Sequence, residues 1–347
     1  MKNCLSITFA YLAAVIGAGF ASGSEIVFYF LKFGRISILG VFLAAAGFGI
    51  MAWLILLTCT QRGISSFGEL AECIMPPPAA AFISAVFMIF MTVMLGAMIS
   101  AFVHMSGFIT GLGGAASSLI FCLLCFLVLL LPSEKIIKWS SCLGVFIVVF
   151  ICGICVYLIN NRCVNVFSDF VSMNISAGAY TAYNTFAVCP MLCEMSVRIK
   201  TKRQCAAVGI MSAVLSFAAL FLLWCIIAVF YGKINLGDMP MLTIAARQGK
   251  IFCLLYSSVI FAAVLTSAAA NGFGIYLRMK KVKLSKFLKL ACIMTAGAFV
   301  ASIGFSNIVD KLYKAAGFAS VILPLYLVYN IIKNSDFIHK TEKTRDI

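Results

Sequence analysis

Long apolar runs recur along the whole 347-residue chain, and they limit its possible folds more than any other feature. Apolar runs of about 18 residues or more are typical of transmembrane helices, because about twenty helical residues span the hydrocarbon core of a bilayer. Hydrophobic residues make up 63% of the chain and charged residues 11%, whereas a soluble domain carries about 25% charged residues. We therefore exclude a soluble enzyme and expect an all-α membrane protein.

The apolar runs are separated by Gly, Pro and charged clusters, and they predict ten transmembrane helices. Segment 233–250 is too polar to span, and we expect a short interfacial helix at 240–248 within it. No small-residue cleavage site follows the first run, which indicates a retained span and not a signal peptide. The predicted spans are 5–31, 37–59, 79–106, 115–131, 137–159, 166–195, 205–231, 251–277, 285–304 and 308–332.

Positive residues lie mostly between the runs, and their distribution predicts the topology. If the N-terminus is cytoplasmic, eighteen of the 26 Lys and Arg residues fall on the inner side and eight on the outer side. Because Lys and Arg favour the inner side, both termini are expected in the cytoplasm. The formal net charge of +15 then reflects membrane topology, and the expected partner is the lipid bilayer, with no role for nucleic acid.

Most of the fifteen cysteines lie inside apolar runs, including the C-x-x-C pairs Cys122/Cys125 and Cys152/Cys155. Neither pair has a nearby histidine, so we interpret these cysteines as small hydrophobic residues and expect no metal or redox site from them. Zinc-protease and paired-aspartate motifs are also missing from the sequence, and we expect no enzymatic activity.

Two of the runs contain polar or glycine-rich interruptions. Three glycines and two serines fall within the nine residues 17–25 of the first run. Irregular backbone at mid-depth survives only beside a cavity or ligand, so this segment predicts a broken helix; the alternative is close packing of a neighbour at Gly17 and Gly19. In the sixth run, polar and aromatic residues fill 179–185 and Pro190 follows, which predicts a second break or, alternatively, ordinary interhelical hydrogen bonding.

The positions of the two interruptions suggest an internal repeat. Spans one and six are the first members of two five-helix halves, and an odd number of helices inverts the second half relative to the first. Paired interruptions in inverted halves are typical of a transporter site at the bilayer midplane. We predict one transmembrane domain over 1–347, with repeat one at about 5–160, repeat two at about 166–333 and a cytoplasmic tail at 334–347.

The eighth run carries two adjacent hydroxyl groups, on Thr266 and Ser267. Hydroxyl and carbonyl oxygens are hard ligands that suit a cation such as sodium. The alternative is that both hydroxyls bond to carbonyls one turn earlier in the same helix, as is common in membrane helices.

With these features the chain resembles the LeuT-fold transporters and, more narrowly, the YkvI-type family of bacterial membrane proteins. The residues that carry the resemblance are Ile16 to Gly23 with Glu25, Tyr183-Asn184, and Leu265-Thr266-Ser267. The resemblance implies ten helices in a LeuT-like 5+5 inverted repeat with helices 1 and 6 broken, in the bacterial cytoplasmic (inner) membrane. It also implies a sodium site formed by the hydroxyls of Thr266 and Ser267 with the carbonyls of Ala263, Ala13 and Ile16.

The resemblance places the substrate site between the two breaks and implies an amino-acid-like solute. His104 can equally be an interfacial or packed histidine. The expected substrate-binding residues are Gly17, Ala18, Gly19, Ser22, Ser100, His104, Tyr180, Tyr183 and Asn184.

Glu25 is an ionisable residue within a span, which is a functional hypothesis by itself. It is predicted to be a gate residue, a proton carrier, or a carboxylate paired with Arg35 or Lys32 at the outer end.

These features favour sodium-coupled symport of an amino acid or similar small solute by alternating access. The fifth span, 139–159, has no lysine, and in ion-independent or proton-driven members of the fold such a lysine can replace the sodium ion. Spans one, two, six and seven are expected to move against the remainder. The competing hypotheses are a proton-coupled carrier that uses Glu25 or His104, and a solute-sensing, germinant-receptor-like subunit without net transport. The oligomeric state is left open.

Overall fold

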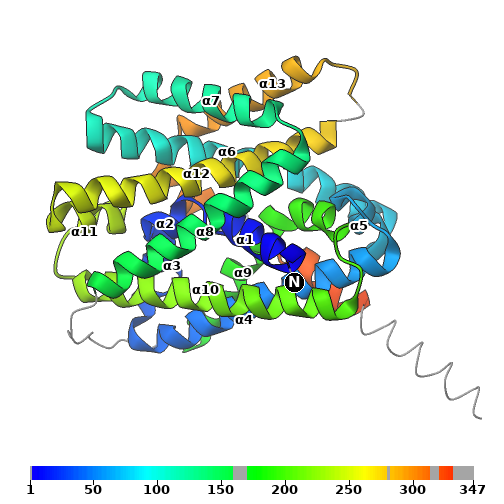
Figure 1. Cartoon of the computed structure of the whole chain (residues 1–347), viewed down its shortest axis with the longest axis horizontal. Coiled ribbons are helices and arrows are strands. Elements are labelled where there is room, and N and C mark those ends of the chain that lie inside the picture. The colour runs from blue at the N-terminus through cyan, green and yellow to red at the C-terminus, as the bar shows by residue number, and fades with distance from the viewer. Residues whose placement is uncertain (1, 159–169, 280–281, 313–319, 331–347) are drawn as a thin grey trace, which may run out of the picture.

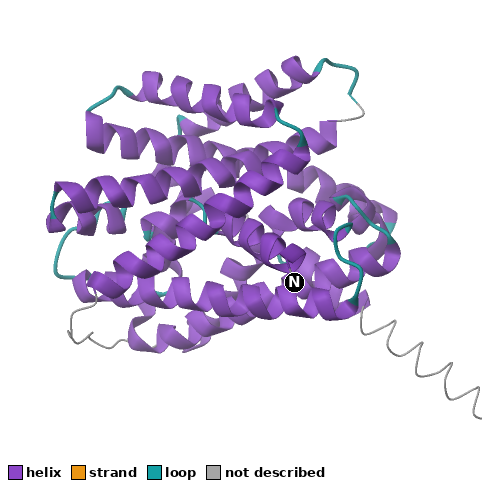
Figure 2. Ribbon diagram, in the orientation of Figure 1, coloured by secondary structure: helices purple, strands orange, loops and turns teal. Residues whose placement is uncertain are grey.

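The computed structural model describes residues 2–158, 170–279, 282–312 and 320–330. These residues form helices and connecting loops, with no strand among them (Figure 2). The elements are α1 (Lys2–Val15), α2 (Ala18–Ser22), α3 (Ser24–Tyr29), η1 (Leu31–Ile36), α4 (Ser37–Arg62), α5 (Phe67–Ile74), α6 (Pro77–Thr110), α7 (Gly114–Leu130), α8 (Ser133–Leu158), α9 (Phe170–Ser196), α10 (Lys202–Phe230), α11 (Pro240–Gln248), α12 (Lys250–Arg278), α13 (Lys286–Ala301), α14 (Phe305–Asn307) and η3 (Ile308–Leu312).

Four of the described helices are individually long and apolar enough to cross a membrane. A fifth candidate is the pair α7 and α8, which meet at an angle of 116°. Every predicted span falls on one or more of the helices, the last of them only in part, and the predicted helix at 240–248 is confirmed as α11. The total of ten spans stays a prediction, and the predicted tail at 334–347 lies outside the described residues. The four spans are Leu31–Arg62, Pro77–Thr110, Lys202–Phe230 and Lys250–Arg278.

The predicted break in the first helix is confirmed. Helix α1 ends at Val15, Ile16 and Gly17 are not helical, and α2 begins at Ala18. A second interruption follows at Gly23, whose φ of +81° lies in the left-handed region that glycine adopts without steric cost. Close packing at Gly17 is also present, because a Cβ added there would lie 3.2 Å from Met98 Cε.

The predicted break in the sixth helix is wrong, since α9 is one continuous helix from Phe170 to Ser196. Its polar residues bond within the helix. The Asn184 amide donates to the Tyr180 carbonyl at 3.1 Å, and the Thr181 hydroxyl donates to the Ala177 carbonyl at 3.0 Å. Pro190 lies inside the helix without ending it. Polar residues in an apolar run therefore indicated a break that is not needed, because each served a carbonyl one turn earlier.

The broken helix lies in the middle of the bundle. In Figure 1, α1 lies between α10 and α12, and it also contacts α8 and α9. Helices α4 and α10 run side by side, while α6 packs against α12, α7 and α13. Large apolar side chains that remain exposed lie on these outer helices, as contact with lipid requires; they include Phe42, Ile89, Leu119, Ile210 and Phe299.

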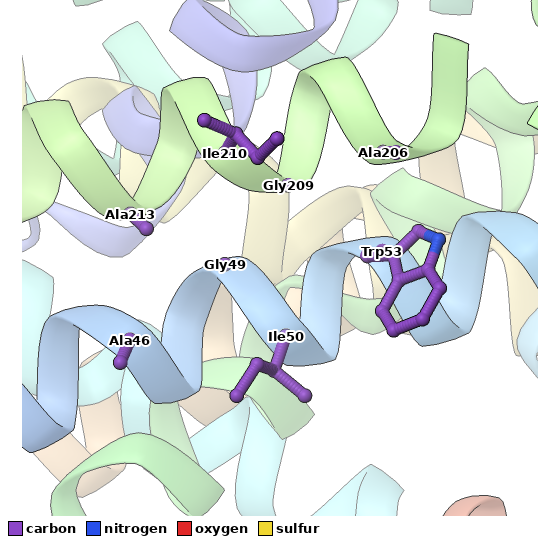
Figure 3. Close-up of a pocket in the computed structure, with 8 residues that line it drawn as sticks. All are labelled: Ala46, Gly49, Ile50, Trp53, Ala206, Gly209, Ile210 and Ala213. Carbon is purple, nitrogen blue, oxygen red and sulfur yellow. The ribbon is translucent and has the colours of Figure 1, made fainter. Parts of the chain in front are cut away.

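Helices α4 and α10 approach most closely where Gly49 faces Gly209 (Figure 3). A Cβ added to Gly49 would lie 2.5 Å from the Gly209 carbonyl oxygen, and a Cβ added to Gly209 would lie 2.8 Å from the Gly49 oxygen. Only residues without a side chain allow two helix backbones to come this close. Ile50 and Trp53 of α4, with Ile210 of α10, border a shallow surface groove over this crossing.

We expect Gly49→Ala to lower the stability of the protein by about 1–3 kcal/mol, the usual cost of overpacking. The added methyl group would meet the backbone of α10, which cannot rotate away as a side chain can. The matched control is Gly178→Ala on α9, where an added Cβ meets nothing within 4 Å. The control should be neutral or stabilising by up to about 1 kcal/mol, because alanine favours helix. Thermal unfolding of both purified variants in detergent measures the difference, and equal melting temperatures would contradict the close contact.

Candidate functional site

The break in the first helix leaves backbone carbonyls without their usual donors. In a continuous helix the Gly17 amide would donate to the Ala13 carbonyl, but here it donates to the Val15 carbonyl at 2.8 Å. The Ala14 carbonyl is also among the last four of α1, which have no partner inside a helix that ends at Val15. Both carbonyls are buried in the bundle, where an unsatisfied polar group is costly.

Two hydroxyl groups of α12 meet these carbonyls. Thr266 Oγ1 lies 3.0 Å from the Ala13 carbonyl oxygen, and Ser267 Oγ lies 3.2 Å from that of Ala14 and 3.5 Å from that of Ala13. Thr266 Oγ1 is also 3.0 Å from the Ala263 oxygen and 3.0 Å from the Ala262 oxygen. Bonding within the helix, the alternative considered from the sequence, is thus present together with the contact to α1.

The oxygens of this cluster outnumber the hydrogens that can join them. Thr266 has one hydroxyl hydrogen but three carbonyl oxygens at 3.0 Å, and Ser267 has one hydrogen for two. A hydroxyl donates to one acceptor at a time, so lone pairs remain directed at one another. Four of the five oxygens predicted as sodium ligands are two hydroxyls and two carbonyls of this cluster, from Thr266, Ser267, Ala13 and Ala263. An excess of oxygen acceptors in a buried site suits a hard cation. Ile16, the fifth predicted ligand, is the first non-helical residue after α1.

Glu25 lies on the backbone of the broken segment. Its side chain folds back from α3 over Gly19, so that a Cβ added to Gly19 would lie 2.1 Å from Oε1 and 2.5 Å from Cδ. The residue is 3% exposed. Tyr183 and Tyr180 are hydrogen-bonding neighbours of its carboxylate, while Oε2 has no partner at hydrogen-bonding distance among the described residues.

Three tyrosines gather beside this carboxylate. Tyr29 follows Glu25 by one turn on α3, and Tyr180 and Tyr183 come from α9. The Tyr29 ring centroid lies 5.2 Å from that of Tyr180 and 5.7 Å from that of Tyr183, and the last two are 5.6 Å apart. All three side chains are buried. The cluster joins the α3 part of the broken helix to the continuous helix α9.

Side-chain hydrogen bonds hold α2 in place. The hydroxyls of Ser22 and Ser24 both donate to the Gly19 carbonyl at 3.3 Å. From α12, the Tyr256 hydroxyl donates to the Ala21 carbonyl at 2.7 Å. These bonds replace some of the backbone bonds lost at the two interruptions, which is how irregular backbone is tolerated at membrane depth.

The predicted substrate-binding residues do not all lie together. Gly17, Ala18, Gly19 and Ser22 belong to the broken segment, with Tyr180 and Tyr183 beside it through Glu25. The Asn184 amide is engaged by its own helix, and Ser100 is buried on α6, the helix that contacts Gly17 through Met98. These are listed in the sequence analysis as one set, but His104 stands apart. Its Nε2 lies 3.5 Å from Asp238 Oδ2, and its side chain is 37% exposed.

Two groups in this region were not predicted from the sequence. The Ala14 carbonyl contacts Ser267, and only the exact end of α1 determines which carbonyls are freed. Tyr29 completes the aromatic cluster. Its spacing of four residues from Glu25 places both on one face of a helix, which is the signal that could have identified it.

Comparisons with known proteins agree with this architecture. No protein-family model matches the chain. It is 25% identical over 335 residues to "Uncharacterized membrane protein YkvI" of Bacillus subtilis (strain 168), an alignment that covers 91% of this chain and 92% of the relative. The resemblance to a YkvI-type membrane protein is therefore confirmed.

Solved structures share the fold. A Na+-coupled sialic acid symporter in a substrate-bound outward-open state has a TM-score of 0.64 at 15% identity, with 92% of this chain and 77% of that chain covered. MhsT in complex with L-phenylalanine has a TM-score of 0.55 at 14% identity, with 93% and 87% covered. A mutant of the Eremococcus coleocola manganese transporter has a TM-score of 0.58 at 16% identity, with 95% and 78% covered. The predicted LeuT-type fold is confirmed, with the correction in α9 given above.

We expect Gly19→Ala to destabilise the protein, because the added methyl group would overlap the Glu25 side chain, including its Cγ at 2.5 Å. Glu25→Ala should relieve most of this cost in the double variant, since it removes the atoms that clash. The two substitutions should therefore couple by about 0.5–3 kcal/mol, as residues in direct contact do. Thermal unfolding of the two single variants and the double variant gives this coupling energy. Strictly additive effects would show that the carboxylate does not lie over Gly19.

Proposed function

We propose that this protein is a secondary active transporter that carries an amino acid or similar small solute together with sodium, by alternating access. The observation that carries the proposal is the oxygen cluster in which Thr266 and Ser267 of α12 meet the carbonyls freed at the end of α1. The fold supports it, because the structures that share this fold are described as a Na+-coupled symporter, a phenylalanine-bound protein and a manganese transporter.

The position of the oxygen cluster explains how an ion could control the conformation. Ala13 and Ala14 lie in the first span, which we place in a moving group with α4, α9 and α10, whereas Thr266 and Ser267 lie on α12 in the remainder. Helix α4 packs against both α9 and α10, and α1 contacts α9 and α10, which supports their movement as one unit. A cation in the cluster would join the two parts, and it would shift the equilibrium toward the conformation in which they meet.

The two five-helix repeats, at about 5–160 and 166–333, are part of the proposal. Their support is the contact of equivalent helices, since α1 packs against α9, α4 against α10, and α6 against α12. The contact of Gly49 with Gly209 is reciprocal, and a local twofold axis produces reciprocal contacts of this kind. An inverted pair of halves related in this way provides two equivalent ways to open the site, one toward each side of the membrane.

We expect Thr266→Ala and Ser267→Ala to raise the sodium concentration needed for half-maximal solute binding or uptake by about tenfold or more. Each substitution removes one oxygen from the cluster, and bonds to a charged group are worth about 1.5–3 kcal/mol. Thr295→Ala is the control, because Thr295 is an exposed threonine whose hydroxyl donates only to the Ala291 carbonyl of its own helix. Uptake into proteoliposomes, with sodium or potassium as the only cation, measures the effect.

The same experiment separates the competing hypotheses. Equal uptake in the two salts with a dependence on pH would contradict sodium coupling and favour a proton-coupled carrier. Solute binding without net uptake in proteoliposomes would favour a sensing subunit. Thermal stabilisation by sodium that survives in both variants would show that sodium binds at another place, since a ligand raises stability only through the site that it occupies.

A further inference from the structure

The Glu25 carboxylate is a buried acid that lacks a complete set of partners. One of its oxygens, Oε2, has no hydrogen-bond partner among the described residues, although the residue is almost fully buried. An ionised carboxylate in an apolar interior is stable only when a cation or several hydrogen bonds compensate it. The nearby Lys32 lies with its ammonium over the rings of Phe28 and Phe33, 4.6 and 4.8 Å from their centroids. Glu25 is therefore arranged to receive a cation that arrives from outside the chain.

The surroundings of Glu25 select the kind of cation. The faces of aromatic rings attract cations, and organic ammonium groups are the ligands that such clusters recognise. Tyr29, Tyr180 and Tyr183 present three rings at tilted or edge orientations beside the carboxylate. The Tyr29 hydroxyl is buried without a hydrogen-bond partner among the described residues. A strongly hydrated metal ion gains little from ring faces, whereas an alkylammonium group fits both the rings and the carboxylate.

The place of the carboxylate also matters. Glu25 covers Gly19 in the broken segment, which is where we place the solute. A solute with its own carboxylate at this point would set two negative charges side by side in a site of low dielectric constant, which is strongly unfavourable. A solute that carries an ammonium group and no neighbouring carboxylate meets one opposite charge.

We propose that Glu25, Tyr29, Tyr180 and Tyr183 form the recognition site for the ammonium group of the solute, and that the solutes are organic amines without an α-carboxylate. This inference rests on the proposed transport function and narrows its solute from amino acids to amines. The rings pack against one another in the conformation described, so the amine enters when α3 and α9 separate. Glu25 then acts as the counter-ion of the solute.

The test compares each amine with the amino acid that yields it by decarboxylation. Three pairs serve as probes: histamine and histidine, tyramine and tyrosine, and cadaverine and lysine. Binding to the purified full-length protein in sodium is measured by calorimetry and by thermal stabilisation. We expect at least one amine to bind about tenfold or more tightly than its amino acid, because like-charge repulsion is removed.

Two variants then examine the residues. Glu25→Gln keeps the shape of the side chain but removes its charge, and it should weaken amine binding by about tenfold or more. Tyr29→Leu should weaken it by a few-fold through the loss of one ring face. Glu134→Gln is the control, because Glu134 is an exposed carboxylate at the start of α8. Circular dichroism and the elution volume in gel filtration show whether each variant is folded. If Glu25→Gln fails to fold, Tyr29→Leu and the paired probes still decide the question.

Each result has one meaning. Tighter binding of amines that is lost in Glu25→Gln supports the inference. Amino acids that bind in sodium as tightly as their amines, or amine binding unchanged in a folded Glu25→Gln, would overturn it and leave the proposed symport intact. If none of the six probes binds and none is taken up in sodium, the amine assignment is overturned as well. Sodium stabilisation that depends on Thr266 and Ser267 is measured without any solute, so it tests the proposed function separately.

Discussion

Backbone carbonyls that lose their helical partners inside an apolar bundle need other partners, and this need organises the centre of the protein. Helix α1 ends at Val15 within the bundle, so the carbonyls of Ala13 and Ala14 turn to the hydroxyls of Thr266 and Ser267. The short helix α2 needs the same help, which it receives from Ser22, Ser24 and Tyr256. An apolar environment without water makes each of these contacts necessary. The broken helix is consequently tied to α12 at two points, on either side of the glycines.

The break in the first helix was predictable because glycine removes both the side chain and the conformational restraint at one place. The fold followed from the spacing of apolar runs together with a resemblance carried by a few residues. The continuity of α9 was not predictable in the same way. Asn184 and Thr181 look identical in sequence whether they bond outward or to carbonyls of their own helix, and only the rotamers decide between the two. The ends of helices are equally hard to locate, which is why Ala14 was missed while Ala13 was identified.

Charge is distributed with similar economy in the described part of the bundle. Glu25 is buried at the broken segment, whereas the ion pair of His104 with Asp238 lies toward solvent. His104 was predicted near the solute because it shares a span with Ser100, but one helical turn carries a side chain about 5 Å along the axis. A residue on the correct helix can thus lie at the wrong depth. Depth depends on the tilt and contacts of α6, which the pattern of apolar residues does not specify.

Pro190 gives α9 a compliant joint. Proline has no amide hydrogen, so the Phe186 carbonyl lacks the donor that the helix would normally supply. The part of α9 that carries Tyr180 and Tyr183 is fully bonded and acts as a stiff rod, while the part beyond Pro190 can bend at lower energetic cost. That second part is attached to the end of α4, because the Ser196 hydroxyl donates to the Ile64 carbonyl at 3.0 Å and Cys193 Sγ lies 3.7 Å from Cys59 Sγ. Bending at this joint would swing the corner between α4 and α5 and leave the tyrosines in place, so one end of the protein can open while the other keeps its shape.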